Sequence, residues 1–223
     1  MVRRTKEEAQ ATRSRILDTA ELVFERRGVS GTSLNEIAKA AGLTRGAIYW
    51  HFADKADLFN AMMERVTLPL EESGAVRAFP GPDATLGHMR DGFVDVLRKM
   101  AADPQLKRVF DIATQKVEYV GEMNAVRERR LAMRDGCLAD IERAFRRAVR
   151  SGAMPKGMAP RSAALGMIAL FDGLLQHWML DRDRFDLLRV GRPVLDAYLR
   201  GLATAARAPA TAGTAAAAGA ATA

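Results

Sequence analysis

The chain is poor in the residues that mark secreted and metal-binding proteins, with 1 Cys and 3 His among 223 residues. A lone Cys137 cannot form an internal disulfide, which excludes a disulfide-framed secreted scaffold and predicts a reducing, cytoplasmic location. His51, His88 and His177 are scattered, and no paired Cys/His spacing indicates a metal site, so we expect no metal and no cofactor. The opening residues MVRRTKEEAQ hold no apolar segment, so no signal peptide is expected.

Catalytic and membrane-spanning patterns are also missing. The sequence has no GxSxG, P-loop or HExxH motif and no arguable nucleophile–base pair, which predicts a protein that is not an enzyme. The longest weakly charged stretch, at 162–180, contains Asp172, Gln176 and His177. Because a carboxylate at the centre of a bilayer costs about 3 kcal/mol, we expect a buried helix of a soluble protein and no membrane partner.

What the sequence does have is a basic surplus, 34 Lys and Arg against 27 Asp and Glu, with a net charge of +7. Such a surplus favours a polyanionic partner, either nucleic acid or an anionic membrane surface, without choosing between them. Residues 1–65 carry a net charge of only +2, so local placement matters more than the total. The arginines between 127 and 150 are typical of a solvated helix face.

Helical periodicity dominates the chain, and no run with the period of a strand is found. A capping box from Thr5 to Glu8 predicts the start of a first helix that Gly28 ends. A second box, from Ser33 to Glu36, predicts a short helix that Gly42 ends. The sequence therefore predicts an all-α fold.

Thr44 is expected to cap a third helix at 45–51, and Asp54 a fourth, with Pro69 inside or just after it. The segment FPGPD at 79–83 predicts a break. Longer helices are expected at roughly 84–102, 104–120, 122–151, 159–181 and 186–205. These elements predict three parts: a compact N-terminal helical domain at 1–66 with a flexible basic arm at 1–9, a second helical domain at 67–205, and a disordered Ala-rich tail at 206–223.

Residues 33–52 have helix-turn-helix form, because Ile37, Ala41, Ile48 and Phe52 are spaced to pin two short helices together. The outer side of the second helix is then free to enter a major groove about 12 Å wide. Residues predicted to contact bases or phosphates are Arg3, Arg4, Thr32, Ser33, Thr44, Arg45, Gly46, Ala47, Tyr49, Trp50, His51 and Lys55. The alternative is a plain antiparallel helix pair with its Tyr and Trp in the core.

Aromatic and methionine side chains, with a few polar groups among them, predict an adaptable apolar pocket in the C-terminal half; the alternative is ordinary core. Asp172 would orient a polar or cationic effector, with Gln176 one turn away, or pair with an arginine for structural reasons. Cys137 is interpreted as a small hydrophobic residue rather than a redox sensor. Residues predicted to bind the ligand are Met89, Phe93, Val96, Phe110, Thr114, Cys137, Ile141, Met167, Phe171, Asp172 and Gln176.

Residues 10–66, most clearly TSLNEIAKAAGLTRGAIYWHFADKADL at 32–58, resemble the DNA-binding domain of TetR-family transcriptional repressors. The branch that controls multidrug efflux pumps, with its AcrR-like and TtgR-like repressors, is the most similar. KVEY at 116–119 and FDGLLQHWML at 171–180 support the same branch. The resemblance implies an all-helical homodimer with an N-terminal DNA-binding domain and a C-terminal domain that binds effector and dimerises. Pro69 departs from the family pattern, in which the fourth helix continues.

The sequence therefore predicts a ligand-responsive repressor of a multidrug efflux operon, released from a near-palindromic operator of double-stranded DNA by a hydrophobic effector. Apolar residues of the last two helices are sufficient for a four-helix dimer interface, which would place two recognition helices about 34 Å apart. The alternatives are a helical, non-enzymatic protein at an anionic membrane surface and a TetR-like regulator of unrelated metabolic genes.

Overall fold

The computed structural model describes residues 2–72 and 85–204, and within these ranges every regular element is a helix. The all-α prediction is therefore confirmed. The N-terminal helices are α1 (Val2–Arg27), α2 (Leu34–Ala40), α3 (Arg45–His51) and α4 (Lys55–Glu72). The remaining elements are α5 (Leu86–Ala102), α6 (Pro104–Gln115), the 3-10 turn η1 (Gly121–Met123), α7 (Asn124–Arg150), α8 (Pro160–Leu180) and α9 (Leu187–Thr204). The predicted break at 79–83 and the tail at 206–223 lie outside the described residues.

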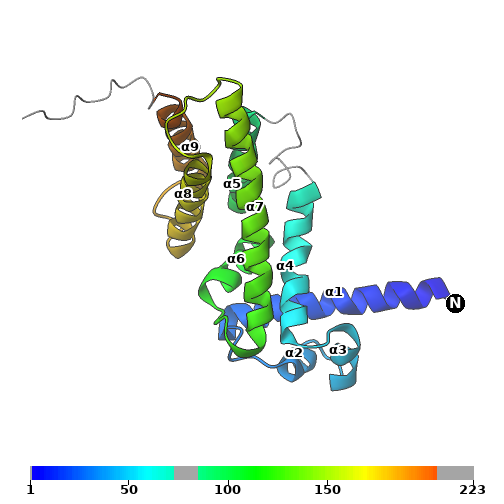
Figure 1. The fold of residues 1–223 in the computed structure, drawn as a ribbon. Coiled ribbons are helices and arrows are strands. Elements are labelled where there is room, and N and C mark those ends of the chain that lie inside the picture. Colours follow the sequence, from blue (N-terminus) through cyan, green and yellow to red (C-terminus); the bar gives the residue numbers. More distant parts are fainter. Residues whose placement is uncertain (1, 73–84, 205–223) are drawn as a thin grey trace, which may run out of the picture.

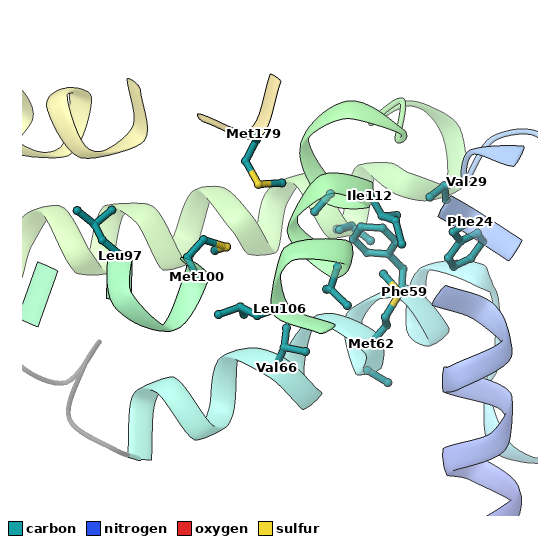
Figure 2. Close-up of a cluster of buried hydrophobic side chains, with 14 of the residues drawn as sticks. Phe24, Val29, Phe59, Met62, Val66, Leu97, Met100, Leu106, Ile112 and Met179 are labelled. Carbon is teal, nitrogen blue, oxygen red and sulfur yellow. The ribbon is translucent and has the colours of Figure 1, made fainter. Parts of the chain in front are cut away.

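A single hydrophobic cluster connects the N-terminal helices to the C-terminal bundle. Phe24 of α1 and Phe59 of α4 lie with their ring centroids 6.4 Å apart. Figure 2 shows these two rings beside Val29 and Ile112, so α6 packs against α1 and α4. The N-terminal helices and the bundle therefore share one set of tightly packed side chains.

The first helix begins earlier than predicted. α1 starts at Val2, so Thr5 lies inside the helix rather than at its cap, and Arg3 and Arg4 have helical backbone instead of forming a flexible arm. The segment KEEAQ that follows Thr5 consists of strong helix formers, which outweigh the capping pattern. Figure 1 shows α1 extending well beyond the other N-terminal helices towards the N-terminus. The predicted end is correct, since Gly28 has φ +75° and its N–H donates to the Phe24 carbonyl at 2.9 Å.

The sixth helix ends earlier than predicted, at Gln115 instead of residue 120. Hydrogen bonds between Lys116 and the end of α1 favour a non-helical backbone there. The Lys116 carbonyl accepts from the Val29 N–H at 2.8 Å, and the Lys116 Nζ donates to the Glu25 carbonyl at 2.7 Å. The segment after α6 is thereby fastened to the end of α1.

Helix α4 continues through Pro69 to Glu72, so the proline does not end it. Proline removes one backbone donor and crowds the preceding turn, but Pro69 is exposed, where water can satisfy the freed carbonyl. The predicted boundary between residues 66 and 67 therefore falls inside a continuous helix. Figure 1 shows α4 rising from beside α3 towards the bundle.

Helices α8 and α9 pack together against the rest of the bundle, with α8 lying against α7 (Figure 1). The Tyr198 hydroxyl of α9 donates to the Ala163 carbonyl of α8 at 2.8 Å. Among the described residues, α8 is the one helix long and apolar enough to cross a membrane by length and composition, and 28% of its apolar window is buried. It is thus less buried than predicted, because Leu165 and Leu180 remain 45% and 63% exposed.

Candidate DNA interface and effector cavity

Reciprocal caps fix the orientation of the helix pair α2 and α3. The Glu36 N–H donates to the Ser33 Oγ at 3.3 Å, while the Glu36 carboxylate accepts from the Ser33 N–H at 2.8 Å. The hydrogen bonds from the Ser33 backbone and hydroxyl, with the nearby charge of Arg27, hold the pKa of Glu36 below its usual value. At the start of α3, the Thr44 Oγ1 accepts from the Ala47 N–H at 3.2 Å. The second capping box and the Thr44 cap are both confirmed.

The outer face of α3 is free of packing contacts that would bury it. Ile48 and Phe52 hold the helix to the core, with 0% and 1% of their surfaces exposed. On the opposite side Tyr49 and Trp50 are 46% and 73% exposed, and the Arg45 guanidinium lies 5.4 Å from the Tyr49 ring centroid. A core role for this Tyr and Trp, the alternative considered from the sequence, is therefore wrong.

Two residues that were predicted to contact phosphates, Thr32 and Lys55, are instead buried and bonded within the protein. Thr32 is 3% exposed, and its hydroxyl donates to the Gly28 carbonyl at 2.8 Å. Lys55 is 9% exposed; its Nζ donates to the Thr32 carbonyl at 3.1 Å and pairs with the Glu122 carboxylate at 2.9 Å. Lys55 thus ties the start of α4 to η1. His51 is half-buried, and burial, together with the charge of Arg13, lowers its pKa.

A buried carboxylate joins α1, α4 and α6. Glu21 is 2% exposed and accepts from the Gln105 Nε2 at 2.8 Å and from the Arg65 Nη2 through a short ion pair. Its second oxygen lies 3.5 Å from the Arg108 Nη1. Arg65 also pairs with Asp18 at 2.7 Å. We call Glu21, Arg65, Gln105 and Arg108 the Glu21 network.

A cavity of about 500 Å³ opens between α4, α5, α6, α7 and α8. Six of the predicted ligand residues line it: Phe93, Val96, Phe110, Cys137, Phe171 and Asp172. The sequence did not single out the others as ligand residues, namely Thr67, Tyr119, Arg127, Arg130, Leu131, Met133, Arg134, Ile168 and Leu175. The Phe93 and Phe171 rings lie 4.8 Å apart, so the two aromatic side chains form one wall.

The other five predicted ligand residues do not line this cavity. Met89, Ile141 and Met167 are completely buried in the core. Thr114 and Gln176 are exposed, and the Thr114 hydroxyl donates to the Phe110 carbonyl at 2.8 Å. The apolar face of a helix is visible in its periodicity, but which part of that face borders a cavity depends on the neighbouring helices.

Three arginines of α7 change the character of the cavity. Arg127, Arg130 and Arg134 occupy one side of the helix and line the cavity. All three remain exposed, as predicted for a solvated helix face, and the sequence did not predict that this face borders a cavity. The Arg130 Nη1 donates to the Ala113 carbonyl at 2.8 Å and also contacts the Tyr119 hydroxyl. Their positions at i, i+3 and i+7 align all three on the cavity side.

Asp172 is the one acidic side chain among the lining residues that the structure describes, and it is exposed rather than buried as predicted. Partial desolvation by the cavity walls raises its pKa, against the opposite effect of Arg134 and Arg130. Burial and the charge of Asp172 raise the pKa of the Cys137 thiol to about 11, which agrees with an unreactive, hydrophobic role. In the described ranges, no group of three or more His, Cys, Asp or Glu side chains is placed to hold a metal ion.

Comparison with known proteins agrees with this arrangement over most of the chain. The regulatory protein TtgR of Pseudomonas putida is 40% identical over 190 residues, covering 84% of this chain and 90% of TtgR. The structure of NalD, the secondary repressor of the MexAB-OprM multidrug efflux pump in Pseudomonas aeruginosa, superposes with a TM-score of 0.80 and 34% identity, covering 88% of this chain and 98% of NalD.

The triclosan complex of SmeT, the repressor of the Stenotrophomonas maltophilia pump SmeDEF, superposes with a TM-score of 0.74 and 32% identity, covering 86% of this chain and 91% of SmeT. Residues 16–62 match the bacterial regulatory proteins of the tetR family, and residues 84–204 match the C-terminal region of MAATS-type transcriptional repressors. The chain therefore belongs to the TetR family of bacterial transcriptional regulators.

Proposed function

We propose that this chain is a cytoplasmic repressor of a multidrug efflux operon, released from its operator when a ligand enters the cavity. NalD and SmeT are each described as repressors of such pumps, and both share more than 30% identity with this chain. The single observation that carries the proposal is the outer face of α3, where Trp50 is 73% exposed beside Arg45 and Tyr49. An exposed face of this composition is suited to the major groove.

The proposed DNA contacts divide into two groups by chemistry. Arg45 would bond a guanine edge, while Gly46 and Ala47 let the helix backbone approach the groove closely. Tyr49 and Trp50 would contact the sugar–phosphate backbone, as would Ser33 and Thr44 at the starts of α2 and α3. These contacts would set the register of the protein on the DNA. Arg3, Arg4 and His51 would add further phosphate contacts; Thr32 and Lys55, which are engaged within the protein, would contribute by holding the helix pair in place.

Dimerisation would use the face that α8 and α9 leave uncovered. Leu165 and Leu180 are exposed on α8, whereas Ala163, Met167 and Trp178 on the same helix are buried within the chain. Two copies of this helix pair would bury the exposed side chains in a four-helix interface. The symmetry of such a dimer requires a near-palindromic operator with half-sites about one turn apart, or 34 Å.

Helix α4 would connect the cavity to the DNA. Its first residue, Lys55, contacts the helix-turn-helix region and η1, and Thr67, three turns further along, lines the cavity. A ligand that favours one position of α4 would change the spacing of the two recognition helices. The operator affinity changes only if the ligand binds the two arrangements unequally, with a typical coupling of about 1–3 kcal/mol.

Fluorescence anisotropy with a labelled fragment from upstream of the gene tests the proposal. We expect sequence-specific, salt-sensitive binding that triclosan, the ligand of SmeT in its complex, weakens about 5- to 150-fold. Arg45→Ala should cost about 1–3 kcal/mol at one base position. Arg143→Ala is the control, because Arg143 is an exposed residue of α7 paired with Asp140 and not part of the cavity.

Two results would contradict the proposal. If Arg45→Ala and Arg143→Ala bind the fragment equally well, α3 does not read the operator. If neither triclosan nor other hydrophobic ligands loosen the complex, release by a hydrophobic effector fails, and a TetR-like regulator of unrelated metabolic genes is the better interpretation.

A further inference from the structure

The described side chains that line the cavity carry a surplus of positive charge, which an adaptable hydrophobic pocket does not require. Arg127, Arg130 and Arg134 supply three guanidinium groups, and among the described lining residues Asp172 is the one carboxylate. The remaining walls are largely aromatic and aliphatic, with Phe93 and Phe171 in contact. Positive charge on one wall and apolar surface on the others is complementary to a molecule with an anionic end and an apolar body.

Internal partners satisfy only part of this positive charge. Arg130 is occupied, since its guanidinium bonds the Ala113 carbonyl and the Tyr119 hydroxyl. Within the described residues, Arg127 and Arg134 make neither a hydrogen bond nor an ion pair closer than 4 Å; Arg134 is only in electrostatic range of Asp172. Arg129, Arg143 and Arg146 of the same helix are paired with Glu64, Asp140 and Glu142, whereas Arg147 and Arg150, which do not line the cavity, have no acidic partner among the described residues.

We infer that the cavity selects amphipathic organic anions, with Arg127 and Arg134 binding the carboxylate or other acidic group of the ligand while Phe93 and Phe171 pack against its apolar body. Asp172 then opposes anion binding. This role differs from both sequence-based alternatives, in which Asp172 orients a polar or cationic effector or pairs with an arginine. The inference rests on the proposed function only in taking the cavity as the effector site. It assigns the chemical class of the ligand, which the likeness to other repressors does not.

Three ligands with one naphthalene ring and different charge test this selectivity by isothermal titration calorimetry on the full chain at pH 7.5. They are 2-naphthylacetate, 2-naphthylethanol and 2-naphthylethylammonium. Because a hydrogen bond to a charged group strengthens binding by about 10- to 100-fold, the carboxylate should bind tighter than the alcohol by this factor, and the ammonium should bind weakest. Equal affinities, tighter binding of the ammonium, or a Kd of the carboxylate weaker than about 1 mM would each overturn the inference.

Variants locate the selectivity at the named side chains. Arg127→Gln combined with Arg134→Gln should abolish the preference for the carboxylate and leave the alcohol affinity within about twofold, because both residues lack internal partners that hold the fold. Arg143→Gln is the matched control on the outer side of α7 and should bind all three ligands as the wild type does. Asp172→Asn should tighten carboxylate binding; weaker binding would contradict the opposing role of Asp172.

Operator release, measured in the anisotropy assay, separates this inference from the proposed function. If the carboxylate binds preferentially but no ligand weakens operator binding, the ligand class stands and the proposed function fails. If neutral or cationic ligands release the operator while the calorimetric preference for the anion is absent, the proposed function stands and the assignment of the ligand class is wrong.

Discussion

The Glu21 network gives a direct test of how the N-terminal helices are held to the bundle. Glu21→Gln keeps the shape of the side chain but replaces the buried carboxylate, 2% exposed, by a neutral amide. The positive charges of Arg65 and Arg108 then repel each other without the carboxylate that neutralised them. Breaking a buried ion pair by removing one partner costs about 3–5 kcal/mol. We expect the lower end, about 3 kcal/mol, because Arg65 keeps Asp18 and Arg108 keeps Glu25.

Thermal unfolding of both proteins at the same concentration measures this effect, because the stability of any oligomer depends on concentration. For a chain of this size, about 3 kcal/mol corresponds to a decrease in Tm of about 6–12 °C. Glu64→Gln is the control: it also removes the acid of an arginine pair, that with Arg129, but both partners are well exposed at 40% and 49%. Exposed pairs contribute about 0–1 kcal/mol. If the two variants unfold at the same temperature, the Glu21 network does not hold the two regions together.

Three further predictions follow from the charges and pKa shifts. Glu122→Gln should tighten operator binding and steepen its salt dependence by about 0.9 in log–log slope, because Lys55 loses its one carboxylate partner and only the Thr32 carbonyl still holds it away from a phosphate. An unchanged slope would show that Lys55 stays inside. Since burial and Asp172 raise its pKa from 9.0 to about 11, native Cys137 at pH 8 should react with iodoacetamide about a hundredfold more slowly than in denaturant. An NMR titration should give His51 a pKa below the usual value of 6.5, and the pKa should stay low in Arg13→Gln because burial is the larger cause. The contribution of neutral His51 to stability is present above pH 6.5 and is lost as the pH falls towards the lowered pKa, since the unfolded chain then binds the proton more readily.

Local signals predicted the helix-turn-helix region well because its elements begin and end at residues with a clear stereochemical role. Gly28 and Gly42 have φ of +75° and +66°, which only glycine adopts easily, and Ser33 forms the reciprocal cap that its spacing with Glu36 indicates. The exception is α1, where a run of good helix formers extends the helix through the capping pattern at Thr5.

The cavity was predicted only in part, because its composition depends on tertiary neighbours. Phe93 and Phe171 stand out in a sequence as large apolar residues. Arg127 and Arg134 have the same local pattern as any solvent-facing arginine, and only the packing of α4, α5, α6 and α8 beside α7 turns their side of the helix towards a cavity. Lys55 shows the same limit, since its partner Glu122 lies 67 residues away in sequence and no local pattern connects the two.

The two tryptophans, Trp50 and Trp178, differ in exposure to solvent and can therefore serve as two intrinsic fluorescence probes. Trp50 is 73% exposed on α3, so its emission should be red-shifted, accessible to acrylamide, and protected when α3 enters a groove. Trp178 is 6% exposed, with Lys107 and Arg182 5.9 and 5.8 Å from its ring centroid, and its blue-shifted emission should resist the quencher. Fluorescence from one unlabelled sample can therefore follow occupancy of the DNA-facing helix and the integrity of the bundle as two separate signals.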